Sequence, residues 1–265
     1  MTEITDWSGE RIVPSAVDSE SFANHIARYI FASQYAKEGL IIDAACGAGY
    51  GSAYLSSQNK NRTIIGIDID EDAVDWAVKA FSKQRTELKY QIGDINKLPF
   101  ESESVDSIVS IETIEHLQDV SKINSEFLRC LKPGGVLIAS VPDKETNTDA
   151  GELNHFHYNE MYIEDFKKFF EGYSSLEFFI QELPVTSQKL KIRSLIVGIF
   201  PSSVKAYIKH KFSKIAGLNS ISSVKDVDIF IKNNTALIDK YYPIKEKKWN
   251  KKNKNRYVFV CKATK

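Results

Sequence analysis

Carboxylates follow the first predicted strands of the chain, and a glycine-rich turn follows the first of these carboxylates. Asp43 ends the apolar run that begins at Leu40, and Gly47 and Gly49 come four and six residues later. Glycine lets a backbone approach a ligand closely, so this stretch predicts a buried strand that leads into a ligand-binding loop. Asp68 ends the next apolar run, 21 residues after Gly47, where a carboxylate can accept hydrogen bonds from both hydroxyls of a ribose.

The charges around this loop select the class of ligand. A pyrophosphate-binding loop has the spacing Gly-x-Gly-x-x-Gly, and here Ser52 stands at the third glycine position. The carboxylate of Asp43 would repel a pyrophosphate and could pair with an ammonium group. S-adenosylmethionine carries an ammonium and a sulfonium and has no phosphate, so we predict a site for this methyl donor. A nicotinamide dinucleotide is the alternative, and its binding in the absence of S-adenosylhomocysteine binding would decide in its favour.

Two further residues could contact such a donor. Asp94 follows a third predicted strand and could accept a hydrogen bond from the exocyclic amine of adenine, with apolar Ile95 beside the ring. The alternative is that Asp94 only stabilises a turn. Arg28 lies on a predicted amphipathic helix over residues 20–36. Its forked donors could clamp the carboxylate of the methyl donor, although an ordinary surface cation would also fit the pattern.

The elements that must position these residues alternate along the chain. Five predicted strands with helices between them imply a parallel sheet with right-handed crossovers and helices on both faces. Ligands in such sheets bind beyond the carboxyl ends of the strands. Asp43, Asp68, Asp94 and Glu112 all follow strands, so we expect them at one edge of the sheet.

Several motifs of the chain resemble those of class I S-adenosylmethionine-dependent methyltransferases, over residues 8–182 and again near 256–263. Within that superfamily the chain is similar to bacterial methyltransferases that modify surface sugars and polysaccharides. The motifs are Gly9-Glu10-Arg11-Ile12-Val13-Pro14, His25-Ile26-Ala27-Arg28-Tyr29, Ala45-Cys46-Gly47-Ala48-Gly49-Tyr50-Gly51-Ser52, Glu112-Thr113-Ile114-Glu115-His116-Leu117 and Leu131-Lys132-Pro133-Gly134-Gly135.

The resemblance implies a doubly wound, mainly parallel seven-stranded sheet and S-adenosylmethionine as the cofactor. It places Asp43, Gly47 and Gly49 at the methionine end, Asp68 at the ribose, Asp94 and Ile95 at adenine, and Arg28 at the carboxylate. No metal site is predicted. The expected cofactor-binding residues are Arg28, Asp43, Ala45, Gly47, Gly49, Asp68, Ile69, Asp94, Ile95 and Ile111.

The predicted reaction is methyl transfer to an oxygen of a sugar or surface glycan, with other small-molecule acceptors as an alternative. A hydroxyl is a poor nucleophile, and histidine is the side chain best able to take its proton near neutral pH. His157 lies where the resembling enzymes carry the final histidine of Asn-Pro-Phe-His, although His155 replaces the proline. We expect His157 or His116, aided by Glu112, to act as the base; capping or core-packing histidines are the alternative.

Charge divides the chain into two parts. Residues 1–183 hold 16 Lys and Arg against 31 Asp and Glu, whereas residues 184–265 hold 19 against 4. The basic part could attract an anionic acceptor, or a membrane surface through residues 189–214, or could simply dock on the acidic part. We predict an arm and cap helix (1–38), a cofactor-binding core (39–183), a basic helical insertion (184–255) and a last strand (256–265).

Composition sets the remaining expectations. A chain of 265 residues with 43% hydrophobic and 26% charged residues is typical of one ordinary globular domain. The N-terminus does not resemble a signal peptide, and three widely spaced cysteines argue against a disulfide framework. We therefore expect a cytoplasmic protein. Peripheral association with the inner face of the membrane and homo-oligomerisation are left open, and no nucleic acid is expected as a partner. A non-catalytic, membrane-docked cofactor-binding module is the remaining alternative.

Overall fold

The computed structural model describes residues 19–149, 157–183, 221–245 and 256–265. Its strands are β1 (Gly39–Ala44), β2 (Arg62–Asp68), β3 (Leu88–Ile92), β4 (Val105–Ile111), β5 (Leu131–Pro142), β6 (Ser175–Leu183), β7 (Ile244–Lys245) and β8 (Arg256–Thr264). Its helices are α1 (Ser19–Tyr35), α2 (Tyr50–Gln58), α3 (Glu71–Phe81), α4 (Ser121–Cys130), α5 (Lys144–Asp149), α6 (Ile163–Phe169), α9 (Val224–Asn233) and α10 (Thr235–Asp239), with short 3-10 helices η1 (Ser82–Gln84) and η2 (Ile114–His116).

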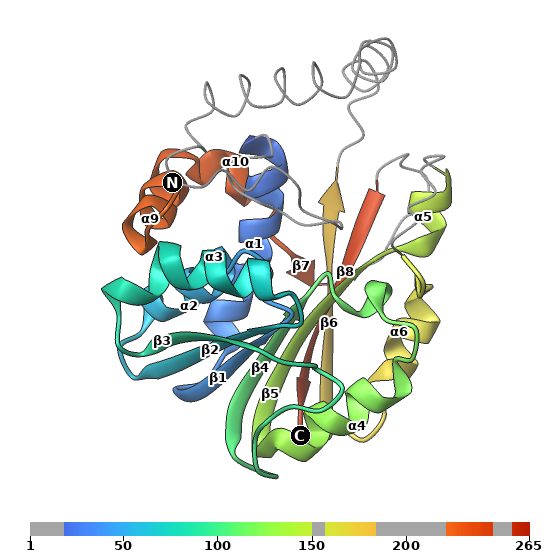
Figure 1. Ribbon diagram of the computed structural model, residues 1–265. Coiled ribbons are helices and arrows are strands. Elements are labelled where there is room, and N and C mark those ends of the chain that lie inside the picture. The colour runs from blue at the N-terminus through green and yellow to red at the C-terminus, as the bar shows by residue number, and fades with distance from the viewer. Residues whose placement is uncertain (1–18, 150–156, 184–220, 246–255) are drawn as a thin grey trace.

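All the described strands form one sheet in the order β3-β2-β1-β4-β5-β8-β6-β7 (Figure 1). The first five strands of this order pair in parallel, and β8 joins β5 and β6 antiparallel. The predicted doubly wound, mainly parallel sheet is therefore confirmed. Strand β7 pairs antiparallel with β6 and forms the edge of the sheet as an eighth strand. The sequence did not predict β7, because two residues are too few to show the alternation of a strand.

Helices cover both faces of the sheet because its strands are apolar on both faces. In β5, Val136 and Ile138 join the core beneath α1, α2 and α3, whereas Leu137 and Ala139 join the core beneath α4 and α6. This alternation has the period of two that a strand imposes on its side chains. Figure 1 shows the two helical layers on opposite sides of the sheet.

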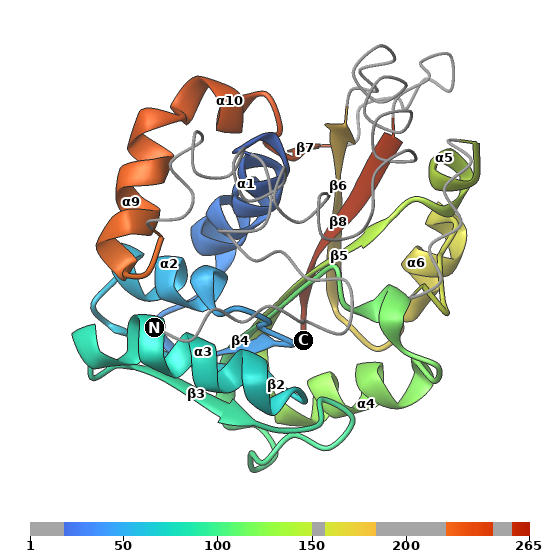
Figure 2. The same ribbon diagram turned by 45° about the horizontal axis from the view of Figure 1, so that its top comes forward.

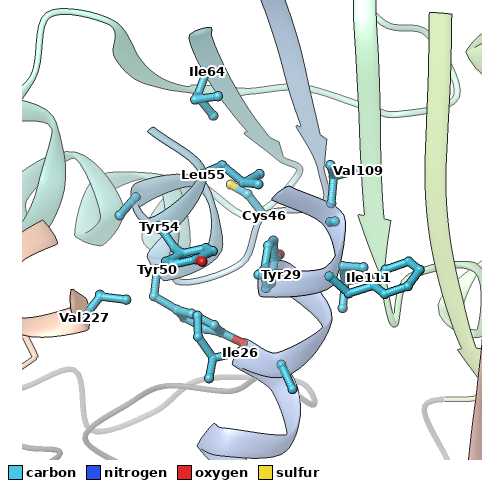
Figure 3. Close-up of a cluster of buried hydrophobic side chains, with 14 of the residues drawn as sticks. Ile26, Tyr29, Cys46, Tyr50, Tyr54, Leu55, Ile64, Val109, Ile111 and Val227 are labelled. Atoms are coloured by element: carbon cyan, nitrogen blue, oxygen red, sulfur yellow. The ribbon is translucent and has the colours of Figure 1, made fainter. Parts of the chain in front are cut away.

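The described part of the predicted insertion packs on the first helical layer. Helices α9 and α10 lie beside α1 and α2 (Figure 2), and the rings of Phe230 and Phe22 are 4.8 Å apart. Val227 of α9 is fully buried in the same cluster as Tyr29 and Tyr50 (Figure 3). Residues 221–245 thus complete the apolar core on this side of the sheet.

Parts of the sequence predictions fall outside the described residues. These are the N-terminal arm (1–18), most of the basic insertion (184–220 and 246–255) with its proposed membrane-binding stretch at 189–214, and the segment 150–156 that precedes His157. Within the described residues, no helix combines the length and the apolar character that crossing a membrane requires.

A buried carboxylate joins α1 and α2 to β1. Asp43 is fully buried, and its two oxygens accept hydrogen bonds from the Tyr29 hydroxyl at 3.2 Å and the Ser52 hydroxyl at 2.6 Å. Burial raises the pKa of Asp43 to about 7, because the bonds from Ser52 and Tyr29 offset only part of the lost hydration. The carboxyl group is therefore protonated in the folded protein at pH values where it is ionised in the unfolded chain.

This shift makes the stability of the fold depend on pH. An acid with a raised folded-state pKa contributes stability that is present below its unfolded pKa, near 4, and lost as the pH rises toward 7. We expect Asp43→Asn to remove a slope of up to about 1.4 kcal/mol per pH unit over this range. The free energy of unfolding of the variant minus that of the wild type, from denaturant titrations at pH 5, 6 and 7.5, should therefore increase with pH.

The exposed Asp75, paired with Lys79 at 3.6 Å, provides the matched control. Asp75→Asn should shift the free energy of unfolding by nearly the same small amount at each of these pH values. A difference for Asp43→Asn that stays flat between pH 5 and 7.5 would contradict the assignment of a protonated Asp43.

Candidate active site

A cavity of about 330 Å³ opens at the carboxyl ends of the central strands. Its walls come from α1, the loop after β1, the ends of β4 and β5, the short helix η2, His157, and the adjoining ends of β6 and β8. The cavity brings together seven of the residues predicted from the sequence: Arg28, Ala45, Gly47, Ile111, Glu112, His116 and His157. The other predicted residues, Asp43, Gly49, Asp68, Ile69, Asp94 and Ile95, do not line it.

The loop between β1 and α2 owes its shape to backbone conformations that glycine adopts readily. Gly49 has φ of 77°, and a Cβ atom there would lie 2.6 Å from Cβ of Ala77 and 2.7 Å from the Tyr90 ring. Gly47 has φ of 52°, but a Cβ atom there would meet nothing within 4 Å. Conformation therefore requires the glycine at 47, and both conformation and packing require the one at 49.

Asp68 holds this loop from the end of β2. Its Oδ2 accepts a hydrogen bond from the backbone N–H of Gly47 at 2.8 Å, and its Oδ1 accepts one from Asp70 at 3.0 Å. The side chain is 5% exposed. Asp68 therefore fixes the relative position of the first two strand ends, and it lies at the strand end where the sequence predicted a ribose contact.

Among the other predicted cofactor-binding residues, Ile69 follows β2, and the two residues expected at adenine, Asp94 and Ile95, follow β3. Ile69 is 72% exposed, an unusual exposure for a large apolar side chain. Asp94 is exposed, and its Oδ1 accepts hydrogen bonds from the backbone and side-chain nitrogens of Asn96. Ile95 is 6% exposed and belongs to the core beneath α4. Ile69 and Asp94 thus offer an apolar surface and an acceptor side by side along the sheet edge.

Arg28 is fully buried in the wall of the cavity. Its Nη1 donates to the side-chain oxygens of Asn24, at 2.7 Å, and of Gln181. Its Nε and Nη2 make no hydrogen bond within the described part of the chain, and Nη2 lies 3.8 Å from Oε2 of Glu112. These two nitrogens form the side-on fork that binds a carboxylate through parallel hydrogen bonds. A buried donor left without a partner costs about 1–3 kcal/mol, so this fork fits an anionic ligand.

Asp43 does not line the cavity. Its carboxylate is occupied by Tyr29 and Ser52 and is fully buried. The structure therefore shows Asp43 as an anchor for α1 and α2, and its predicted contact with an ammonium group stays a prediction.

Glu112 presents its side chain at the end of β4 through a strained backbone. Its φ is 50°, a conformation that costs a residue other than glycine on the order of 1 kcal/mol or more. The backbone N–H of Glu112 donates to the carbonyl oxygen of Ser140, and the hydroxyl of Ser140 donates to Oε1 of Glu112 at 3.1 Å. These bonds hold the carboxylate against the cavity while its other oxygen faces Arg28.

The two candidate bases, His116 and His157, meet in the wall of the cavity. The rings of His116 and His157 are 5.0 Å apart and nearly perpendicular. Nδ1 of His157 lies 3.0 Å from Oε1 of Glu160. The backbone N–H groups of Tyr158 and Asn159 both donate to the carbonyl oxygen of Glu115, which fastens the segment after His157 to η2.

Some cavity residues were not predicted from the sequence. Glu115 is 1% exposed and lines the cavity. It lies between Glu112 and His116 in the sequence, and this position could have marked it as a candidate site residue. His25 lies three residues before Arg28 on one helix, and desolvation together with the Arg28 cation holds its pKa well below the usual range. Gln181 lies 153 residues from Arg28 in the chain, and nothing local marks it as a partner.

The sequence of this chain is similar to those of known methyltransferases. Residues 42–139 match the family model described as a methyltransferase domain. A probable S-adenosylmethionine-dependent methyltransferase of Mycolicibacterium smegmatis is 32% identical over 157 residues, which cover 58% of this chain and 59% of that protein. The chain spans little more than half the length of this and two Mycobacterium tuberculosis relatives.

Solved structures agree on the fold. The YcgJ protein of Bacillus subtilis is 20% identical, with a TM-score of 0.58 and coverage of 91% of this chain and 99% of that chain. A phosphoethanolamine N-methyltransferase of Haemonchus contortus, solved with S-adenosyl-L-methionine, is 16% identical, with a TM-score of 0.53 and coverage of 92% and 56%. Residues 42–139 are therefore similar in sequence to a methyltransferase domain, and the chain shares the Rossmann-like fold of these solved structures.

Proposed function

We propose that this chain is an S-adenosylmethionine-dependent methyltransferase. The observation that carries the proposal is the buried guanidinium of Arg28, whose fork faces the cavity beside the glycine loop without a hydrogen-bond partner among the described residues. The carboxylate of an amino acid is the kind of anion that this fork binds. The amino-acid end of the cofactor would lie against Arg28, and its ribose and adenine would lie against Asp68 and Ile69 at the neighbouring strand ends.

The same loop disfavours the nicotinamide alternative. A pyrophosphate needs free backbone N–H groups and positive charge at the helix N-terminus. Here the Gly47 N–H already donates to the carboxylate of Asp68. Glu112 and Glu115 add negative charge to the cavity wall, which a cationic sulfonium tolerates better than a pyrophosphate does.

We further propose that the acceptor is a hydroxyl of a sugar or surface glycan. Relatives and structural neighbours are named for methylation of phosphoethanolamine, a sterol and geranyl diphosphate, so the fold alone does not select the acceptor. The polar side chains of His116, His157, Glu112 and Glu115 line this cavity. Sterol and isoprenoid pockets are mainly apolar, whereas this polar wall suits a polyol. The excess of basic residues in 184–265 favours an acceptor that is phosphorylated or lipid-linked.

Bound in this way, S-adenosylmethionine would supply a methyl group on a positively charged sulfur. The chain would then hold the acceptor oxygen in line with that group, and such positioning can account for about 7–11 kcal/mol of a barrier. The proton of the acceptor hydroxyl would pass to His157 or His116, with Glu112 stabilising the charge that forms. A correctly placed base contributes about 10²–10⁴-fold.

The test of this function is a search for the methylated product. The full chain is incubated with labelled S-adenosylmethionine and a glycan-containing cell extract, and mass spectrometry identifies the product that carries the label. Label on a sugar oxygen supports the proposal. Label on an amine or a lipid carbon would support the proposed methyltransferase activity and contradict the proposed sugar acceptor. Binding of a nicotinamide dinucleotide without binding of S-adenosylhomocysteine would contradict both proposals.

Arg28 offers a sharp test of the cofactor site. Arg28→Lys keeps the charge but removes the fork, so we expect the dissociation constant of S-adenosylhomocysteine to rise about 10-fold or more in isothermal titration calorimetry. The matched control is Arg62→Lys. Arg62 is also buried, donates to the carbonyl oxygens of Ser33 and Ala36, and does not line the cavity. Equal weakening in both variants, or none in Arg28→Lys, would contradict the assigned role.

The two histidines are tested together because their rings touch and one could replace the other. We expect His116→Ala/His157→Ala to lower turnover of the labelled product by about 10²–10⁴-fold. The affinity for S-adenosylhomocysteine should stay close to that of the wild type, because the proposed cofactor contacts at Arg28 and the glycine loop are not changed by the two substitutions. Unchanged turnover would show that positioning alone provides the acceleration.

A further inference from the structure

We propose that Glu115, His116 and His157 form a binding site for a divalent transition-metal cation at the acceptor end of the cavity. One possible ligand atom from each of these side chains lies within 4.8 Å of the others. All three residues line the cavity. Binding of the metal stands on this geometry alone, whereas its role in catalysis rests on the proposed function.

The spacing of the three ligand atoms is close to what one ion needs. Bonds of about 2.0–2.2 Å from nitrogen and carboxylate oxygen place the ligands of one Zn²⁺ about 3–3.5 Å apart. The upper limit of 4.8 Å in the metal-free side chains therefore leaves about 1–2 Å to close. Rotation of the partly exposed rings of His116 and His157 can supply that movement.

The scaffold around the three residues is already fixed. Glu115 and His116 are neighbours in the short helix η2, and its backbone is tied to the segment of His157 by the N–H groups of Tyr158 and Asn159, both donating to the carbonyl oxygen of Glu115 at 2.8 and 2.9 Å. The side-chain amide of Asn159 donates to the carbonyl oxygen of Leu117 in addition. The two halves of the site cannot separate without breaking these bonds.

Glu160 orients the ring of His157. Oε1 of Glu160 lies 3.0 Å from Nδ1 of His157, and we assign the neutral ring the tautomer that donates its Nδ1 proton to this carboxylate, with the lone pair on Nε2. A carboxylate that orients a histidine in this way is the usual outer partner of a metal-binding imidazole. Glu160 is thus a positioning residue rather than a ligand.

The residue types select the class of metal. Two imidazoles and one carboxylate favour Zn²⁺, Mn²⁺ or Fe²⁺ over Ca²⁺ and Mg²⁺, which prefer oxygen ligands. Three protein ligands leave further positions of the ion open. An oxygen of the acceptor could occupy one of them, and coordination would lower the pKa of an acceptor hydroxyl. In that case the histidines would serve the same oxygen as ligands and not as bases, and the proton of the acceptor hydroxyl would pass to solvent water as the methyl group moves from sulfur to oxygen.

The proposal is tested with Zn²⁺ or Mn²⁺ alone, added to the full chain and measured by isothermal titration calorimetry and by metal content after dialysis. We expect one ion per chain in the wild type. Glu115→Gln and His157→Ala should each weaken binding at least 10-fold, and Glu160→Gln should weaken it less. The matched control is His25→Ala, which removes a cavity imidazole that lies outside the cluster and should leave metal affinity unchanged.

The outcomes separate this proposal from the proposed function. Wild-type affinity for Zn²⁺ and Mn²⁺ no greater than that of His116→Ala/His157→Ala would overturn the metal site, and retained binding of S-adenosylhomocysteine would leave the methyltransferase standing. Tight binding of one ion that depends on Glu115 and His157 supports the metal site even if no methylated product is found.

Discussion

A buried cation with an unsatisfied hydrogen-bonding fork is the constraint around which this molecule is arranged. Removing the guanidinium of Arg28 from water is costly. Among its nitrogens, only Nη1 donates hydrogen bonds within the described residues, to the side-chain oxygens of Asn24 and Gln181. Gln181 in turn donates to the carbonyl oxygens of Asn24 and Tyr241. Gln181 of β6 therefore joins α1 to the segment after α10. An anion in the cavity would accept hydrogen bonds from the two nitrogens of Arg28 that Gln181 and Asn24 leave unpaired.

Backbone strain is concentrated around the same cavity. Among the described residues other than glycine, Ala45, Glu103 and Glu112 have positive φ values, and two of these three line the cavity. Such conformations persist only where the surroundings impose them. Asp68 imposes the loop that contains Ala45 through its bond to Gly47, and Ser140 imposes the position of Glu112. Functional groups held by such turns are preorganised, which reduces the reorganisation that binding and catalysis require.

Periodicity predicted the fold because apolar runs of one strand length, separated by helical patterns, allow few other arrangements. The same logic placed Asp68 and Glu112 at the strand ends, where the structure has them. The partners of Asp43, by contrast, depend on how α1 packs over β1, and those of Arg28 depend on β6, far away in the chain. Spacing in sequence cannot report contacts of that kind; the motif with Glu112 and His116 could have marked Glu115 as a candidate, but its proximity to His157 depends on the position of η2.

The hydrogen bond from Gln181 to the carbonyl oxygen of Tyr241 links the segment between the last two core strands to Arg28, which Gln181 also contacts. This segment is therefore not structurally independent of the core. A chimaera that imported another acceptor-recognition segment would have to reproduce a main-chain carbonyl at this point, or it would lose the orientation of Arg28 together with its native acceptor. Under the proposed function, a change of this segment for a new acceptor would also alter the cavity wall that contains Arg28.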